Sequence, residues 1–207
     1  MNKDEDPTIK IITIGNAGVG KTSIIKRFVS NEFEENTAST LGLEFTYKKI
    51  NLNNNRTINI KLIDTGGQEK YRALSKTYFK NTDGVLFVFA LNNEMSFTDL
   101  TEWIVLFNEN HNGKDNIPKY LVGNKSDLKK EVDNNNINKF CVQNNLKYFE
   151  TSAKDNKYIN DLFEDIAKFF YETYEKTNLN NTQKAIKIQS QSQNKQKRCI
   201  LFTKDVY

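Results

Sequence analysis

One glycine-rich stretch constrains the fold of this chain more than any other feature. Gly15 to Ser23 reads G-N-A-G-V-G-K-T-S, and it stands between the apolar run 11–14 and apolar residues at helical spacing. The glycines therefore lie in a turn between a strand and a helix, where backbone N–H groups can point inward and the helix start adds the positive end of its dipole. A loop of this kind predicts a phosphate-binding site.

Two side chains at the end of the stretch extend this prediction to a nucleotide with a metal ion. Lys21 would reach the β and γ phosphates as a point charge, and the Thr22 hydroxyl would bind Mg²⁺, an ion that prefers oxygen ligands. The alternative is a plain glycine-rich turn between a strand and a helix. A chance match to the same pattern has a probability on the order of one in a few hundred, so the phosphate loop is the favoured interpretation.

The order of the apolar segments predicts the fold around this loop. Strands are expected at 10–15, 44–52, 57–64, 84–90, 119–123 and 147–150, and helices at 21–30, 71–79, from 96 onward, 132–145 and 159–176. The two strands on either side of the asparagines 53–55 should form a hairpin, whereas the other strands alternate with helices. The predicted class is α/β, with a six-stranded, mainly parallel sheet, one antiparallel edge strand and helices on both faces.

Helical spacing also predicts which side chains face the core. One expected face is Phe97, Leu100, Trp103, Ile104 and Phe107, in a helix that begins at Ser96, and another is Leu162, Phe163, Ile166, Phe169 and Phe170. Such stripes are more typical of core packing than of a cofactor site. His111 stands alone in a polar segment, and we expect a solvated loop histidine there.

Length and charge predict one folded domain with a basic tail. The chain has 207 residues, and we expect a flexible N-terminus at 1–9, a domain at 10–177 and a disordered tail at 178–207. The tail carries six basic residues and one acidic residue, which leaves the rest of the chain close to neutral. This distribution argues against a nucleic-acid-binding face on the domain and favours a tail that contacts anionic surfaces.

The cysteines and the hydropathy pattern predict a cytosolic protein. Cys141 and Cys199 form neither a disulfide framework nor a metal-binding spacing, which is typical of a reducing compartment. The N-terminus has no apolar region of the leader type, and the longest apolar run, 85–91, is too short to span a bilayer.

Two further segments near strand ends predict the rest of a phosphate and metal site. Asp64-Thr65-Gly66-Gly67-Gln68 follows a predicted strand, where the Asp64 carboxylate could hold the water shell of Mg²⁺ and the Gly67 N–H could approach a γ phosphate. The Thr40 hydroxyl, in an irregular segment, could complete the metal shell when a triphosphate is present. Asp64, Thr40 and Thr22 are therefore the candidate metal ligands.

Two segments predict recognition of a guanine base. In Asn124-Lys125-Ser126-Asp127, the Asp127 carboxylate can accept hydrogen bonds from the N1–H and 2-amino groups of guanine, a pair of donors that adenine lacks. In Thr151-Ser152-Ala153-Lys154, small residues allow backbone N–H groups to come near the guanine O6. Each segment alone could be an ordinary turn. Their order relative to the phosphate loop makes a joint coincidence negligible.

Together these motifs resemble the Ras superfamily of small GTPases, and most closely the Rab family, over residues 10–177. The resemblance is carried by G-N-A-G-V-G-K-T, S-T-L-G-L-E-F from Ser39 to Phe45, D-T-G-G-Q-E from Asp64, N-K-S-D and T-S-A-K. It implies the P-loop NTPase fold, with GTP or GDP and Mg²⁺ as ligands. By the same resemblance, Phe33 packs edge-on to the guanine and Gln68 orients the attacking water.

The resemblance also implies roles for single residues. The catalytic residues would be Gln68, Lys21 and Thr40, and the metal ligands Thr22, Thr40 and Asp64. The implied nucleotide contacts are Asn16, Ala17, Gly18, Val19, Gly20, Lys21, Thr22, Ser23, Phe33, Thr40, Gly67, Asn124, Lys125, Asp127, Ser152, Ala153 and Lys154. Three positions depart from the usual Rab pattern. Rab proteins usually have an alanine at the position of Gly66, a tryptophan at that of Ile63 and an aspartate at that of Ala90.

The resemblance implies a GTP-hydrolysing switch of the kind that acts in intracellular vesicle and membrane trafficking.

 The γ phosphate would order the segments 34–45 and 66–79, and effectors would bind that ordered form. An activating protein and an exchange factor are the other implied partners. No arginine is present in the first of these segments, so slow unassisted hydrolysis is expected.

Three alternatives compete with this interpretation. The first is a nucleotide-locked scaffold, a binding module that does not cycle between GTP and GDP. The presence of Gln68 and of all three candidate metal ligands argues against it. An ATP-dependent phosphoryl transferase would have no use for the N-K-S-D segment. RNA binding through the tail is disfavoured because no aromatic residues are interleaved with the basic ones.

The tail predicts peripheral contact with the cytosolic face of an internal membrane. Lys195 to Phe202 reads K-Q-K-R-C-I-L-F, a basic cluster followed by a box that resembles a prenylation signal around Cys199. Thr203 to Tyr207 follow the box, so the box is not at the C-terminus. We therefore expect that a prenyltransferase that recognises a C-terminal box does not modify Cys199 unless these residues are removed by proteolysis. S-acylation of Cys199 is the other lipidation considered, and an unmodified tail is the remaining alternative.

Overall fold

The computed structural model describes residues 6–35, 40, 42–52, 56–66, 77–112 and 117–174. The chain divides into two compact units, Met1–Lys168 and Phe169–Tyr207. The first unit contains the whole sheet and is described below. In the second unit, the described residues 169–174 are helical. No helix in the described ranges combines the length and the apolar character needed to cross a membrane.

The first unit is built on a six-stranded sheet with the order β2-β3-β1-β4-β5-β6. The strands are β1 (Thr8–Ile14), β2 (Leu43–Leu52), β3 (Arg56–Thr65), β4 (Gly84–Ala90), β5 (Lys119–Asn124) and β6 (Lys147–Glu150). β2 pairs antiparallel with β3, and every other pairing is parallel. The predicted α/β class, the hairpin and the antiparallel edge strand are thereby confirmed.

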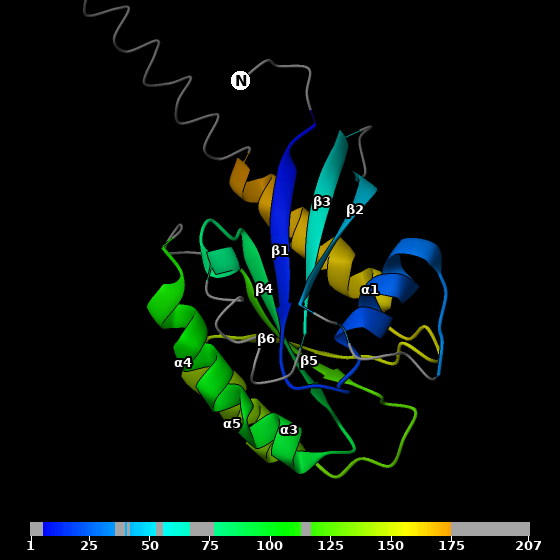
Figure 1. Ribbon diagram of the computed structural model, residues 1–207, viewed down its shortest axis with the longest axis vertical. Helices are drawn as coiled ribbons and strands as arrows, with labels where there is room; N and C mark the ends of the chain where they lie inside the picture. The colour runs from blue at the N-terminus through cyan, green and yellow to red at the C-terminus, as the bar shows by residue number, and fades with distance from the viewer. Residues whose placement is uncertain are drawn as a thin grey trace, which may run out of the picture. The chain divides into compact units, whose positions relative to one another are not determined.

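Helices cover both faces of this sheet, as Figure 1 shows. The labelled helices are α1 (Lys21–Ser30), α3 (Glu94–Thr98), α4 (Leu100–Asn110) and α5 (Asn134–Asn144). Alternation along β1 separates the two layers, because successive side chains of a strand point to opposite faces. Ile12 and Ile14 belong to the apolar cluster that includes Trp103 of α4 and Ile137 of α5.

The opposite layer is closed by aromatic packing between α1 and the helical residues that begin at 159. The rings of Phe28 and Phe163 stack with their centroids 3.8 Å apart. Leu162 and Ile166 are buried as predicted, whereas Phe169 is 42% exposed, so its assignment to the buried face was wrong. β4 is buried at every position, which matches its uninterrupted apolar sequence.

The helix expected from Ser96 begins earlier and is divided in two. Asn93 is the N-cap of α3, where its side chain accepts a hydrogen bond from the Ser96 N–H at 3.0 Å. The helical run is interrupted at Asp99, and α4 starts at Leu100. The apolar spacing hid this break, because Phe97 and Leu100 are buried on both sides of it. An asparagine before a helix is a common start signal, and here it outweighs the apolar pattern.

Two other expectations need correction. α5 starts at Asn134 instead of 132, because the Asp133 side chain caps the N–H groups of Asn135 and Asn136. His111 is half-buried, and its ring stacks on Phe107 at 5.0 Å while Nδ1 lies 2.9 Å from the Phe79 carbonyl oxygen. It is therefore a packing residue and not a solvated one. The helix expected at 71–79 is described only at 77–79.

Candidate functional site

The glycine-rich loop joins β1 to α1, and its glycines adopt conformations that other residues avoid. Gly20 has φ +95°, and a Cβ atom there would run into the Asn124 side chain. Gly15 has φ +147°, and its Cβ would run into the Val88 carbonyl oxygen of β4. The loop can therefore lie this close to its neighbours only with glycine at these two positions.

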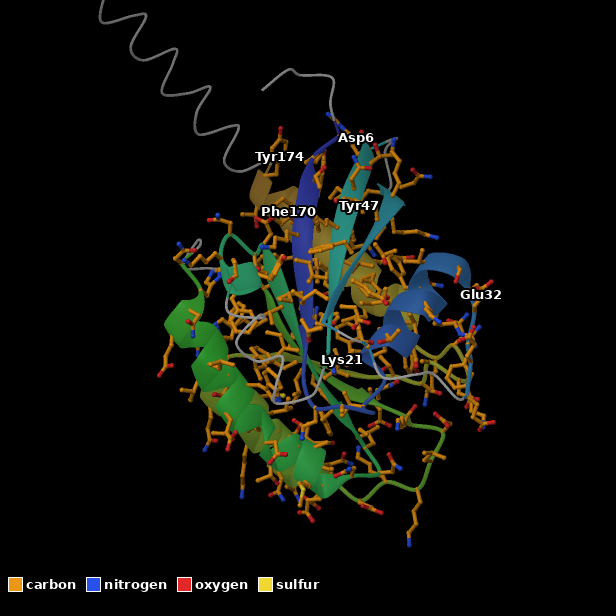
Figure 2. The ribbon with its side chains drawn as sticks, viewed as in Figure 1. Asp6, Lys21, Glu32, Tyr47, Phe170 and Tyr174 are labelled. Atoms are coloured by element: carbon orange, nitrogen blue, oxygen red, sulfur yellow. The ribbon has the colours of Figure 1, made fainter. Side chains whose placement is uncertain are left out.

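Lys21 lies at the junction of β1 and α1, where Figure 2 labels it. Its side chain is buried, and Nζ donates hydrogen bonds to the carbonyl oxygens of Gly15 at 2.9 Å and Asn16 at 2.8 Å. Burial lowers the pKa of Lys21 to about 8, and the nearby Asp64 carboxylate opposes part of that shift. A buried ammonium group inside a loop of this shape favours an anionic ligand.

Three oxygen-bearing side chains from three separate segments meet beside this lysine. Thr22 Oγ1 donates to Asp64 Oδ2 at 2.5 Å and lies 2.8 Å from Thr40 Oγ1, which is 3.4 Å from the same carboxylate oxygen. Burial raises the pKa of Asp64, while the Thr22 hydrogen bond and the Lys21 charge act in the opposite direction. A divalent cation at this point would stabilise the ionised carboxylate.

The donor set fits magnesium better than a softer metal. Hydroxyl and carboxylate oxygens suit a hard ion, and Mg²⁺ typically uses one or two protein carboxylates together with phosphate oxygens and water. Within the described ranges, no group of three or more His, Cys, Asp or Glu side chains forms an alternative metal centre. Thr22, Thr40 and Asp64 are thus the residues that could hold such an ion.

A cavity of about 330 Å³ opens above these residues. This volume lies at the lower end of the range for small-molecule sites, about 300–1,000 Å³. The cavity is lined by Ala17, Gly18, Gly20, Lys21, Thr22, Ser23, Phe33, Glu34, Glu35, Thr40, Thr65, Asn124, Lys125, Asp127, Leu128, Ala153 and Lys154. Most residues predicted to contact a nucleotide therefore come together around one space.

Some predicted site residues lie elsewhere. Asn16, Val19 and Ser152 are not among the residues that line the cavity. The Asn16 side chain points to the junction of α3 and α4, where it donates to Asp99 Oδ2 at 2.6 Å and accepts from Trp103 Nε1 at 2.9 Å. Gly67, Gln68 and Cys199 lie outside the described residues.

Asn124 connects the phosphate loop to the segment after β6. Its Nδ2 donates to the Val19 carbonyl oxygen at 2.9 Å, and its Oδ1 accepts from Ala153 N–H at 3.2 Å and Thr151 Oγ1 at 3.3 Å. The residue is 1% exposed. Asn124 therefore fixes the relative positions of two loops as well as lining the cavity.

Asp127 is held by the same segment. Its Oδ1 accepts a hydrogen bond from Ser152 Oγ at 2.6 Å, and the Ser126 N–H donates to the Thr151 carbonyl oxygen at 3.0 Å. Ser152 thus orients the Asp127 carboxylate. Because the Ser152 hydroxyl points to Asp127, Ser152 itself does not line the cavity. The second carboxylate oxygen and the remaining lone pairs are suited to paired N–H donors of a ligand.

Sequence reasoning missed several residues of this site. Glu34, Glu35, Thr65 and Leu128 line the cavity, although none of them was predicted to contact a ligand. Thr13, in the middle of β1, is fully buried, and its Oγ1 lies 3.1 Å from the Ile63 carbonyl oxygen and 3.4 Å from Asp64 Oδ1. A threonine within an otherwise isoleucine-rich strand was the signal that could have found it.

The sequence matches the family model of the Ras family over residues 10–172. This chain belongs to the Ras family. It is 37% identical to "Ras-related protein Rab-11B" of Dictyostelium discoideum over 168 residues, which cover 80% of this chain and 75% of that protein. It is 36% identical to "Ras-related protein Rab-5B" of Plasmodium falciparum, covering 82% and 81% of the two chains. "Ras-related protein Rab-1" of Theileria parva is also 36% identical, with coverages of 80% and 76%.

Membership of the Ras family makes this chain a small GTPase. Its similarity to the Rab relatives makes it Rab-like within that family. The six-stranded sheet and the glycine-rich loop between β1 and α1 agree with the fold of these GTPases. The predicted family and the predicted enzyme class are thereby confirmed.

Proposed function

We propose that this small GTPase is a switch that binds GTP and GDP with Mg²⁺, hydrolyses GTP to GDP and phosphate, and recruits effectors in the GTP state. The observation that carries the proposal is the meeting of Thr22, Thr40 and Asp64 oxygens, 2.5 to 3.4 Å apart, beside the buried Lys21. Thr40 comes from the segment between α1 and β2, so a ligand that engages it also fixes that segment.

The side chains of the site have distinct parts in the proposed reaction. Lys21 stabilises negative charge on the transferred phosphoryl group, and Gln68 orients the attacking water. Bound Mg²⁺ would supply neutralising charge at the phosphate oxygens, held by Thr22, Thr40 and Asp64. Asn124, Lys125 and Asp127 bind the guanine base, with Phe33 against its edge.

The proposed turnover without a partner is slow, on the order of 10⁻⁴ to 10⁻³ s⁻¹, because the segment after α1 carries no arginine to stabilise the transition state. An activating protein would supply that group, and an exchange factor would release GDP. Effectors would contact residues 34–45 and 66–79, whose arrangement depends on the γ phosphate. The Rab names of the relatives support a role in vesicle and membrane trafficking.

The first test replaces the residue that would orient the water. Gln68→Leu should keep GTP affinity but lower the rate stimulated by an activating protein by at least about 100-fold, because the water loses its hydrogen-bonding group. Single-turnover hydrolysis measures this, and Gln143→Leu on the exposed side of α5 is the matched control. An unchanged rate in the Gln68 variant would instead favour a nucleotide-locked scaffold that does not cycle.

The second test addresses the metal. Thr22→Asn should weaken binding of GTP more than binding of GDP, because Thr22 is one of the residues that would hold the ion, whose positive charge would offset the additional negative charge of GTP. Titrations of both nucleotides with and without Mg²⁺ measure the difference. Thr98→Asn, on the exposed side of α3, changes the same side chain away from the cavity and should alter neither affinity. Equal loss for GTP and GDP at all Mg²⁺ concentrations would contradict the assignment of Thr22.

The proposed domain plan places the GTPase at 10–177, between a flexible N-terminus at 1–9 and a disordered basic tail at 178–207. In this plan the tail brings the protein to the cytosolic face of an internal membrane. A lipid on Cys199 together with the neighbouring lysines and Arg198 would supply the two signals that stable anchoring needs.

Replacement of Cys199 tests the anchor. Cys199→Ser should move most of the protein from the membrane fraction to the soluble fraction of its native cells, and the mass of one lipid chain should disappear from the intact protein. Cys141→Ser is the control, because Cys141 is partly buried in α5 and burial raises the pKa of its thiol. An unlipidated native mass together with an unchanged membrane fraction would rule the anchor out.

A further inference from the structure

Arg27, near the end of α1, holds three backbone carbonyl groups with one guanidinium. Nε donates to the Ala153 carbonyl oxygen at 2.7 Å, and the two Nη groups donate to Lys154 O at 3.0 Å and Asn31 O at 2.6 Å. Ala153 and Lys154 both line the cavity, although they lie 126 and 127 residues further along the chain. Hydrogen bonds from a charged donor are roughly twice as strong as neutral ones, so these contacts constrain both segments.

The same guanidinium also faces Phe33. Its central carbon lies 5.8 Å from the centroid of the ring, within the range of a cation–π contact. Asn31, the residue that ends α1 with φ +59°, donates its N–H back to the Arg27 carbonyl oxygen at 3.0 Å. Arg27 therefore fixes the point at which the chain leaves the helix, and Figure 2 labels Glu32 just beyond it.

Other contacts between these two segments are weaker. Lys154 and Glu35 form an ion pair at 3.2 Å, but their side chains are 47% and 77% exposed. Asn156 Nδ2 donates to Asn31 Oδ1 at 3.1 Å in an exposed position. Exposed pairs contribute little because water and salt screen them. Among the described residues, Arg27 joins the segment that carries Phe33 to the segment that follows β6 through a part-buried hydrogen bond to Ala153 O, two exposed hydrogen bonds and the contact with the Phe33 ring.

We propose that Arg27 is a positioning residue for recognition of the 6-oxo group of guanine. The inference rests on the proposed function, in which the segment 152–154 approaches O6 and Phe33 packs against the base. The Ser152 N–H donates to the Lys157 carbonyl oxygen and the Ala153 N–H to Asn124 Oδ1, whereas the Lys154 N–H belongs to the same peptide unit as the Ala153 carbonyl group that Arg27 holds. Because a peptide unit is planar, the hydrogen bond from Arg27 to the Ala153 carbonyl oxygen also sets the direction in which the Lys154 N–H points. A lysine cannot replace it, because an ammonium group lacks the planar fork that reaches three separate carbonyl oxygens.

The experiment compares three nucleotides on the full chain. GDP carries the natural base, 6-thio-GDP replaces O6 by sulfur, a weak acceptor, and inosine diphosphate lacks the 2-amino group that would bind Asp127. Dissociation constants are measured for the natural protein, Arg27→Lys and Arg27→Gln. The control is Lys26→Met, the neighbouring residue of α1, whose exposed ion pair with Glu34 at 3.1 Å involves neither Ala153 nor Lys154.

We expect Arg27→Lys to lower the preference for GDP over 6-thio-GDP by about 5- to 10-fold, the range for one hydrogen bond. The preference for GDP over inosine diphosphate should stay within about twofold, and Lys26→Met should leave both ratios unchanged. If the Arg27→Lys protein does not fold, Arg27→Gln decides the question, because its amide can still reach one of the carbonyls.

Two results would overturn the inference. An equal loss of affinity for all three nucleotides would mean that Arg27 only stabilises the fold, and unchanged ratios would mean that it has no part in reading the base. Failure of the proposed function would look different. In that case the natural protein itself would bind GDP no better than ADP, before any residue is changed.

Discussion

Asp127→Asn should reverse the base preference of this GTPase from guanine to xanthine. In the proposed function the carboxylate accepts two hydrogen bonds from guanine. Hydrogen bonds to charged groups contribute about 1.5–3 kcal/mol each, so the loss of GDP affinity should be at least about 100-fold. An amide offers a donor in place of one acceptor, which matches the 2-oxo group of xanthine. Its oxygen can still accept the hydrogen bond from Ser152 Oγ, so the segment after β6 should keep its conformation.

Competition between a labelled nucleotide and unlabelled GDP, xanthosine diphosphate and ATP measures this reversal. Asp133→Asn is the matched control, because asparagine and aspartate are nearly equal as helix caps and Asp133 caps α5 outside the cavity. The control should keep the guanine preference. If the Asp127 variant still bound GDP more tightly than xanthosine diphosphate, or if ATP competed with the natural protein as well as GTP does, the base assignment would be wrong.

Asn124→Ala should destabilise the protein by about 3–5 kcal/mol and accelerate nucleotide release by at least about 100-fold. The change removes three hydrogen bonds at a position that is 1% exposed, and it leaves Val19 O, Ala153 N–H and Thr151 Oγ1 without this partner. A buried polar group left without a partner costs about 1–3 kcal/mol. The release rate should rise because the phosphate loop and the segment after β6 lose their common connection.

Urea unfolding of the GDP-bound protein and the dissociation of a labelled GDP measure these two effects. Asn144→Ala is the control, since its side chain donates to the Phe140 carbonyl oxygen of its own helix at 2.9 Å, and alanine is a better helix former. It should change the free energy of unfolding by less than about 1 kcal/mol. A loss of similar size in both variants would mean that Asn124 has no special connecting role.

The sequence allowed much of the fold to be predicted, because local patterns determine it. The bounds of α1 and β4 agree with the prediction to the residue, since a glycine turn defines the start of α1 and an unbroken apolar run defines β4. The start of α3 was missed where a local cap at Asn93 overrode the longer apolar period. His111 was misjudged because the carbonyl group of Phe79, which lies beside its ring nitrogen, is distant in sequence and comes close only in the folded chain.

The residues of the candidate site also fall into two groups, those that local motifs predicted and those that depend on contacts between distant parts of the chain. Residues that carry a motif, such as Lys21, Thr22 and Asp127, line one cavity. Arg27 could not be found by this route, because its role depends on carbonyl groups 126 and 127 residues away. Every residue has a backbone carbonyl group, so the sequence does not indicate which of these groups accepts a side-chain hydrogen bond. Such contacts can be recognised only in the folded structure.

The hydrogen bonds from Asn16 to Asp99 and Trp103 have a consequence for how a ligand is received. They join the first residues of the glycine-rich loop to the start of α4, and Trp103 itself is 1% exposed. The loop can move only if these bonds break or the helix moves with it. Its conformational entropy is therefore lost mainly when the protein folds, and little is left to lose when a nucleotide binds. The loop is preorganised, which raises affinity without any added contact to the ligand.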